Sequence, residues 1–189
     1  MSINLEKGQR ISLEKDGGGI LQKVVVGLGW DVADGGPDID CDASAILCGS
    51  NGKITDKKDI VFYNNKNHPS GSVYSTGDNL TGEGEGDDEQ LIVDLAKVPA
   101  KYEKIVFVVT IYEASKRKQD FGQINNAFIR IVDGGTSKEI MKYSLSEKYP
   151  GKTAMIFGEL YRKDGGWKFT AIGQATEDGA ISEMASRFM

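Results

Sequence analysis

Carboxylates gather in two short stretches of the 189-residue chain. Residues 78–89 contain six acids and residues 31–42 contain five, with no lysine or arginine in either stretch. The two stretches together carry −11, whereas the whole chain carries −5, so the remaining residues carry a net charge of +6. Like charges about 4 Å apart repel by about 1 kcal/mol in water and more strongly near a protein surface. Stretches of this kind are expected either to remain in solvent or to bind a cation.

Residues 77–89 (GDNLTGEGEGDDE) contain the donor types that a hard cation prefers. Asn79 and Thr81 add neutral oxygens to the carboxylates, and four glycines let the backbone turn and direct carbonyl oxygens inward. Ca²⁺ binds about six to eight oxygens in flexible geometry, whereas Mg²⁺ demands an octahedron with few protein ligands. Zn²⁺ and copper would use His or Cys, which this stretch lacks. The residue types therefore favour Ca²⁺ over the other metals.

This stretch does not fit the EF-hand. With Asp78 as the first position, Leu80 and Gly82 occupy ligand positions, and Glu83 occupies the position of the invariant glycine. Only Glu89, at the last position of the loop, matches the pattern. On residue chemistry alone, a Ca²⁺ site of another architecture and a solvated acidic loop both remain open.

The second acidic stretch places carboxylates at the start of a predicted strand. Asp40, Asp42 and Ser44 share the parity that puts side chains on one face of a strand. If this strand end lies beside residues 78–89, the two stretches complete one site, to which Asp31 also belongs. The predicted metal ligands are Asp31, Asp40, Asp42, Asp78, Asn79, Thr81, Glu83, Gly84, Asp87, Asp88 and Glu89.

Short strand-like segments separated by turn signals must position these residues. We predict strands at residues 10–14, 21–27, 43–49, 59–63, 73–76, 90–95, 104–112, 127–132, 139–144, 153–162 and 167–172. Helical signal is limited to one or two turns within 113–123 and a C-terminal helix within 178–188. Strands without crossover helices bury their apolar faces against each other. We therefore predict an all-β protein: an antiparallel β-sandwich of two sheets, over residues 1–175, followed by a tail at 176–189.

The remaining reactive residue types do not suggest catalysis. His68 lies in a polar segment without zinc-type or triad-type neighbours at a recognisable spacing, so we predict a surface histidine and no enzyme. Cys41 and Cys48 are seven residues apart and would point to opposite faces of one strand. We predict two buried, unbridged cysteines.

Basic and amide side chains offer weaker alternatives. Residues 116–118 (KRK) form a short basic run, but a sequence pI near 5.0 argues against nucleic-acid binding. The run is expected to be a solvated turn, or to pair with the acidic loop of another copy in a salt-sensitive self-association. An amide-rich patch within 119–126, with Arg117 and Arg130, is expected to make strand-edge and loop hydrogen bonds or to recognise an anion or an acidic partner.

The chain shows no features of an exported or membrane-spanning protein. The N-terminus lacks a basic start followed by an apolar stretch, so a secretory signal is not expected. The apolar run at 105–112 is too short to cross a bilayer. We predict a cytoplasmic location.

Several motifs together resemble the TerD-domain family of tellurite-resistance and general-stress proteins. The resemblance covers about residues 1–175, and residues 77–89 are its most specific part. The matching segments are 29–31 (GWD), 40–45 (DCDASA), 59–65 (DIVFYNN), 77–89, 121–123 (FGQ), 126–130 (NAFIR), 158–162 (GELYR) and 167–169 (WKF). Cys41 departs from the family pattern, which commonly has leucine there.

The resemblance implies a β-sandwich whose acidic loops bind Ca²⁺, in stress, toxic-anion and phage responses. It further implies an adaptor or sensor within larger, partly membrane-associated protein complexes, and not a catalyst. One relative is a cyclic-nucleotide binder, so a small-ligand or anion-binding role is the alternative.

Overall fold

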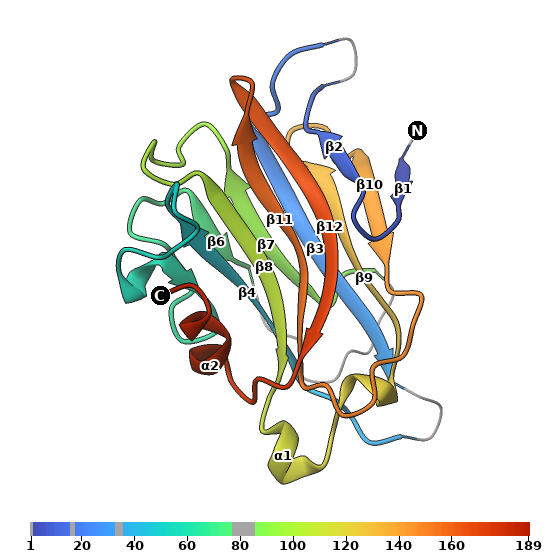
Figure 1. Ribbon diagram of the computed structural model, residues 1–189. Helices are drawn as coiled ribbons and strands as arrows, with labels where there is room; N and C mark the ends of the chain where they lie inside the picture. The colour runs from blue at the N-terminus through green and yellow to red at the C-terminus, as the bar shows by residue number, and fades with distance from the viewer. Residues whose placement is uncertain (1, 16–17, 33–35, 77–85) are drawn as a thin grey trace.

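Two six-stranded sheets pack face to face in the computed structural model (Figure 1), which describes residues 2–15, 18–32, 36–76 and 86–189. In spatial order, the first sheet contains β1 (Ile3–Leu5), β10 (Glu139–Ser144), β9 (Ile124–Asp133), β3 (Lys23–Val32), β7 (Glu89–Asp94) and β6 (Val73–Ser75). The second contains β2 (Arg10–Ser12), β12 (Gly166–Thr176), β11 (Ala154–Lys163), β8 (Lys104–Ile111), β4 (Cys41–Cys48) and β5 (Ile60–Val61). The predicted all-β sandwich is confirmed.

The strand pairs are antiparallel with one exception among the described residues. β1 runs parallel to β10, with Ile3 opposite Met141, so the first sheet is mixed. β1 was not predicted, and the eleven predicted segments each contain a strand. Three strands extend further than predicted toward the acidic residues. β3 continues to Val32 and therefore includes Asp31, β4 begins at Cys41 and includes Asp42, and β7 begins at Glu89.

The main core lies between the sheets. Along β9 the side chains alternate, so that Ile129 and Ile131 are buried while Phe128 and Arg130 are partly exposed. Along β4, Cys41 belongs to this main core and Cys48 to a second apolar cluster. Both cysteines are buried and unbridged, which confirms their predicted state. They face opposite sides of β4 because side chains alternate along a strand.

Short helices cover the edges of the sandwich. α1 (Ala114–Arg117) and two 3-10 turns, η1 (Lys57–Asp59) and η2 (Phe121–Gln123), lie in connections between strands. α2 (Ile181–Ser186) forms the predicted C-terminal helix, and Figure 1 shows it lying against the second sheet. Met184 packs there with Val106 and Ile156 in the second apolar cluster. Across the described residues, no helix is long and apolar enough to span a membrane.

Candidate functional site

The described carboxylates of the two acidic stretches lie near one end of the sandwich. β3 and β7 are antiparallel neighbours with Leu28 opposite Glu89, so the end of β3 lies beside the start of β7. The backbone N–H of Trp30 donates to Oδ2 of Asp88 at 2.8 Å, and the N–H of Asp88 donates to the carbonyl of Leu28 at 2.8 Å. Asp31, one residue further along β3, is therefore close to the segment that precedes β7.

Glu89 connects the two sheets at this end. Its Oε2 accepts a hydrogen bond from the backbone N–H of Ala43 at 2.6 Å, which links β7 of the first sheet to β4 of the second. Glu89 is 6% exposed, and Asp42, next to Ala43 in β4, is 7% exposed. The adjacency that the sequence left open is therefore present for residues 86–89 and the start of β4.

The electrostatic surroundings of Cys41 reflect the same convergence. Burial raises the pKa of the Cys41 thiol well above its ordinary value, and the nearby charges of Glu89, Asp42 and Asp40 raise it further. A thiol between these carboxylates remains protonated at neutral pH. Burial also raises the pKa of Tyr63, and Asp42 is among the charges that add to this effect. The carboxylates thus surround the first residues of β4 with negative potential.

Asp87 has a different environment from its neighbours. Its carboxylate accepts hydrogen bonds from Nε of Arg130 at 2.6 Å, Nη2 of Arg130 at 3.1 Å and Nε2 of Gln90 at 3.0 Å. The Asp87 side chain is only 1% exposed. Both oxygens are therefore bound by protein donors, and the negative charge is compensated by a guanidinium. Asp87 fits the role of a residue that orients the acidic segment better than that of a metal ligand.

Asp31 is exposed, whereas Asp40 is buried. Oδ2 of Asp31 accepts a hydrogen bond from Nδ2 of Asn126 at 2.7 Å. Nη1 of Arg117 lies 3.9 Å from Oδ2 of Asp40, and its guanidinium stacks over the ring of Tyr112 at 5.1 Å. The basic run at 116–118 thus supplies a cation to the acidic end of its own chain.

The donor chemistry of this end suits a hard cation. Asp31, Asp40, Asp42, Asp88 and Glu89 offer only oxygen donors, as Ca²⁺ prefers. Within the described ranges, no three His, Cys, Asp or Glu side chains are grouped closely enough to hold a metal ion. A complete coordination sphere would need donors from residues 77–85. The predicted ligands Asp78, Asn79, Thr81, Glu83 and Gly84 lie outside the described residues.

A cavity of about 450 Å³ adjoins the acidic end. Trp30, Asp31 and Asp88 line one side of it, and Phe128 and Lys142 line another. Nζ of Lys142 lies 3.8 Å from the centre of the Phe128 ring, a cation–π contact. Carboxylates therefore line one part of this cavity, and an aromatic ring with an ammonium group lines another part.

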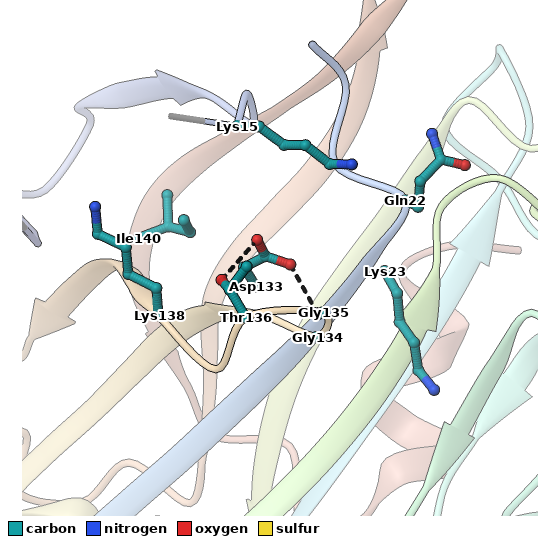
Figure 2. Close-up of a pocket in the computed structure, with 9 residues that line it drawn as sticks. All are labelled: Lys15, Gln22, Lys23, Asp133, Gly134, Gly135, Thr136, Lys138 and Ile140. Atoms are coloured by element: carbon teal, nitrogen blue, oxygen red, sulfur yellow. Dashed lines mark hydrogen bonds between the residues drawn. The ribbon is translucent and has the colours of Figure 1, made fainter. Parts of the chain in front are cut away.

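A second cavity, of about 490 Å³, lies by the opposite ends of β3 and β9. Lys15, Lys23 and Lys138 are among its lining residues, and Figure 2 shows them around the turn that follows Asp133. The Asp133 carboxylate holds this turn by accepting from the N–H of Gly135 and from Oγ1 of Thr136, each at 2.8 Å. Three lysines line this cavity, but Nζ of Lys23 lies 5.8 Å from the centre of the Tyr74 ring, and Figure 2 shows it directed away from the turn.

The predicted amide-rich patch is divided among loop and strand-edge hydrogen bonds. Nε2 of Gln119 donates to the carbonyl of Asp38 at 2.8 Å, and Oε1 of Gln123 accepts from the N–H of Asp120 at 3.2 Å. Nδ2 of Asn126 donates to Asp31. The contacts of Gln119 and Asn126 join residues 81 and 95 positions apart, and they attach this patch to the segments that carry the acidic residues.

The prediction that His68 is a surface residue is wrong. His68 is 4% exposed because the connection between β5 and β6 folds inward and places the imidazole against Asp59 and Tyr102. Asp59 is nine residues away in the sequence and Tyr102 is 34. Contacts over such separations leave no local spacing pattern in the sequence from which the burial of His68 could be predicted.

Comparisons with known proteins agree on one family. The model of the TerD domain matches residues 1–188. Stress response protein SCP2 of Bacillus subtilis (strain 168) is 49% identical over the whole of both chains. Tellurium resistance protein TerD of Serratia marcescens is 50% identical over 98% of this chain and 96% of its own.

A solved structure agrees in fold. It is that of a homologue of telluride resistance protein from Streptomyces coelicolor A3(2), which matches with a TM-score of 0.67 at 19% identity. The match covers 86% of this chain and 94% of that one.

Proposed function

This chain belongs to the TerD domain family, and from that premise we propose that its acidic end binds Ca²⁺ in a stress or tellurium-resistance response. The observation that carries the proposal is the bridge between Glu89 and Ala43, which brings the second acidic stretch to the first. Carboxylates held this close repel one another unless a cation lies among them. A hard divalent ion removes this repulsion and uses the oxygen donors present.

Within this proposal the acidic residues divide into two groups. Asp31, Asp40, Asp42 and Asp88 would contribute to holding the ion, and residues 78–84 would complete its coordination. Glu89 and Asp87 would act as supports, because each accepts strong hydrogen bonds from protein donors. Bound Ca²⁺ would neutralise charge and tie the loops to both sheets. This is a binding role and involves no catalytic step.

Calorimetric titration of EDTA-treated protein with Ca²⁺ tests the site. We expect saturable heat at sub-millimolar Ca²⁺ for the natural chain and a loss of at least about tenfold in affinity for Asp42→Asn, since each lost carboxylate weakens binding to a hard cation. Asp164→Asn is the matched control, because Asp164 pairs with Lys168 in the hairpin between β11 and β12. Absence of heat, or equal affinity in Asp42→Asn and the natural chain, contradicts the proposal.

The cellular role that fits such a site is that of a cytoplasmic adaptor or sensor. A surface whose charge changes on metal binding would attach to other proteins of a stress or tellurite-resistance complex, including membrane-associated ones, or to another copy of this chain. Light scattering after size exclusion, with Ca²⁺ or with EDTA, tests the self-association. A molar mass that is identical in both conditions and at both low and high salt argues against it.

The cavity around Lys15, Lys23 and Lys138 favours a second candidate function, the binding of a small anion such as a cyclic nucleotide. Figure 2 shows the Lys15 side chain extending over the turn that follows Asp133, and the cavity lies at the other end of β3 from the carboxylates, which separates it from the metal proposal. Titration with cyclic nucleotides and with inorganic phosphate distinguishes a nucleotide pocket from a simple anion site. Binding that is unchanged in Lys23→Glu rules this cavity out.

A further inference from the structure

A network of polar side chains is buried where the connection between β5 and β6 folds back onto the sandwich. Nδ1 of His68 lies 2.7 Å from Oγ of Ser70. Nε2 of His68 lies 3.2 Å from the hydroxyl of Tyr102 and 3.5 Å from Oδ1 of Asp59. The Tyr102 hydroxyl lies 2.5 Å from the same carboxylate oxygen. A serine, an imidazole and a carboxylate are thus connected in series, as in a nucleophile–base–acid arrangement.

The available donors fix the directions of these hydrogen bonds. Residues 55–56 donate three hydrogen bonds to Oδ2 of Asp59, so the Tyr102 hydroxyl donates to Oδ1. The proton of His68 then belongs on Nε2, which faces these two oxygens. Nδ1 is left as an acceptor, and it already accepts from the backbone N–H of Ser70 at 3.1 Å. The Ser70 oxygen accepts from the N–H of Ser72 at 3.2 Å and can accept from the Ser72 hydroxyl at 2.6 Å, which leaves its own proton to donate to Nδ1, as a nucleophilic serine does to its base.

The charges of the network suit general-base catalysis. Burial lowers the pKa of His68 below its ordinary value, so the imidazole is neutral and basic at neutral pH. Burial would raise the pKa of Asp59, but hydrogen bonds from Tyr102 and Thr55 outweigh it and lower the pKa to about 2. A permanent carboxylate, 2% exposed, therefore lies behind the imidazole and would stabilise the imidazolium as it forms.

Ser70 lines a cavity of about 370 Å³ from which a reactant can approach. Lys58 and Lys101 are part of the same wall, and Nζ of Lys101 lies 4.7 Å from the centre of the Tyr102 ring. Asp56 also lines this cavity, so groups of both charges surround the approach to Ser70. The cavity lies near the Cys48 end of β4, whereas Asp42 lies at the start of that strand.

We propose that Ser70 is a nucleophilic serine, activated by His68 and Asp59, that takes the acyl group of small activated donors such as acyl phosphates and thioesters. Oγ of Ser70 forms a bond to the acyl carbon, and the bond between that carbon and its leaving group breaks. The serine proton passes to Nδ1 of His68 and then to the leaving group. The products are an acyl-serine ester and the protonated leaving group, and the reaction involves no oxidant or metal.

Acylation by p-nitrophenyl acetate tests the proposal on the full chain. We expect p-nitrophenol release with an acetyl group mapped to Ser70 by peptide mass spectrometry. Ser70→Ala should abolish that modification, and His68→Gln should slow it by about a hundredfold or more, the usual contribution of a general base. Ser50→Ala, in an exposed turn, is the matched control and should react like the natural chain. Acetyl groups on lysines alone, or an unchanged rate in His68→Gln, overturn the proposal.

The pH profile of the natural chain gives a readout that a purely structural histidine would not move. Asp59, Tyr102 and Lys101 are the titratable groups facing His68, and only His68 among them changes its charge near neutral pH. The acylation rate should fall in acid as His68 gains a proton, and it should be level above about pH 6.5. A rate at Ser70 that keeps rising above neutral pH, as for reaction with an unactivated hydroxyl, also overturns the proposal.

Discussion

At the scale of single residues, the pair formed by Asp87 and Arg130 shows how the acidic end is kept in place. The carboxylate is 1% exposed and is bound by two guanidinium nitrogens, while Nη1 of Arg130 also reaches Glu139 at 3.2 Å. An acid buried this deeply is retained only with its partner, because an unpaired buried charge is costly. Arg130 thus allows one carboxylate of the acidic segment to be buried in the wall of the site.

We predict that Arg130→Met lowers the free energy of unfolding by about 3 kcal/mol, since it leaves the Asp87 carboxylate buried without a counter-charge. Arg162→Met would not serve as a control, because Arg162 donates hydrogen bonds to two backbone carbonyls and its loss would destabilise the fold for a different reason. The double variant Arg130→Met with Asp87→Leu is therefore the control, and it should recover part of the loss. Urea unfolding of the three proteins measures this, and equal losses in the single and double variants contradict the pairing argument.

The second prediction at this scale concerns pH. The folded chain holds His68 at a pKa below its ordinary value of about 6.5, so the unfolded chain binds more protons as the pH falls past that value. Stability should therefore decline below about pH 6.5, and this decline should be smaller in His68→Gln. Asp59, with a pKa of about 2, contributes stability that is lost only in stronger acid. Urea midpoints across this range check the result, and parallel profiles for the two proteins would exclude His68 as the cause.

At the scale of elements, β3 is the strand that the acidic segment packs against most closely. A Cβ on Gly27 would lie 2.2 Å from the Asp87 carboxylate, and one on Gly29 would lie 2.5 Å from the Phe128 ring. The absence of side chains at these two positions lets Asp87 and Phe128 pack directly over the strand backbone. Residues 86–88 therefore pack directly against the backbone of β3.

We expect Gly27→Ala to destabilise the fold by about 1–3 kcal/mol, as overpacking of a close contact does. The added methyl would displace Asp87 from Arg130 and would also weaken any Ca²⁺ binding. Gly166→Ala is the matched control, because its nearest neighbouring atom would be 4.0 Å away. Thermal unfolding of both variants measures the difference, and equal melting temperatures would show that Asp87 can move without cost.

The C-terminal helix is the other element with a measurable role. Met184 and Ala185 in α2 are fully buried against the second sheet, and the N–H of Ile54 donates to the carbonyl of Phe188 at 2.7 Å. Met184→Ala should cost about 2 kcal/mol or more, the usual loss for a buried methionine. Ser182→Ala, on the exposed side of the helix, should change stability little. If the two substitutions have the same effect in urea unfolding, α2 does not contribute to the stability of the sandwich.

At the scale of the whole molecule, the charge distribution suggests a metal-dependent stability. The two acidic stretches carry −11 on a chain whose remaining residues carry +6, and their described residues lie near one another where Glu89 links the two sheets. A cation bound there stabilises the folded chain and not the unfolded one, in which the stretches separate. At Ca²⁺ a hundred times above its dissociation constant, the gain would be about 2.7 kcal/mol.

We therefore predict that saturating Ca²⁺ raises the melting temperature by several degrees over the EDTA-treated protein. Mg²⁺ at the same concentration should raise it less, because Mg²⁺ accepts few protein ligands. Differential scanning calorimetry provides the measurement, with Asp42→Asn expected to lose most of the shift. If Ca²⁺ leaves the melting temperature unchanged, metal binding does not contribute to the stability of the fold.

The sequence by itself determined the architecture and the chemical character of the acidic end. Alternating side chains, turn signals and apolar runs depend only on neighbouring residues, so the strands and the sandwich could be predicted. The excess of carboxylates over cations in residues 31–42 and 78–89 is likewise a local property. The separation of Cys41 and Cys48 onto two faces followed from strand parity alone.

Only the tertiary structure decided which groups meet. The contact of Glu89 with Ala43 spans 46 residues, and that of Asp87 with Arg130 spans 43. The contact of His68 with Tyr102 spans 34. Each depends on strand pairing and on the packing of one sheet over the other, which leave no spacing pattern in the chain. For this reason the sequence could not show that Asp87 pairs with Arg130, and a histidine predicted at the surface proved to be buried beside Asp59.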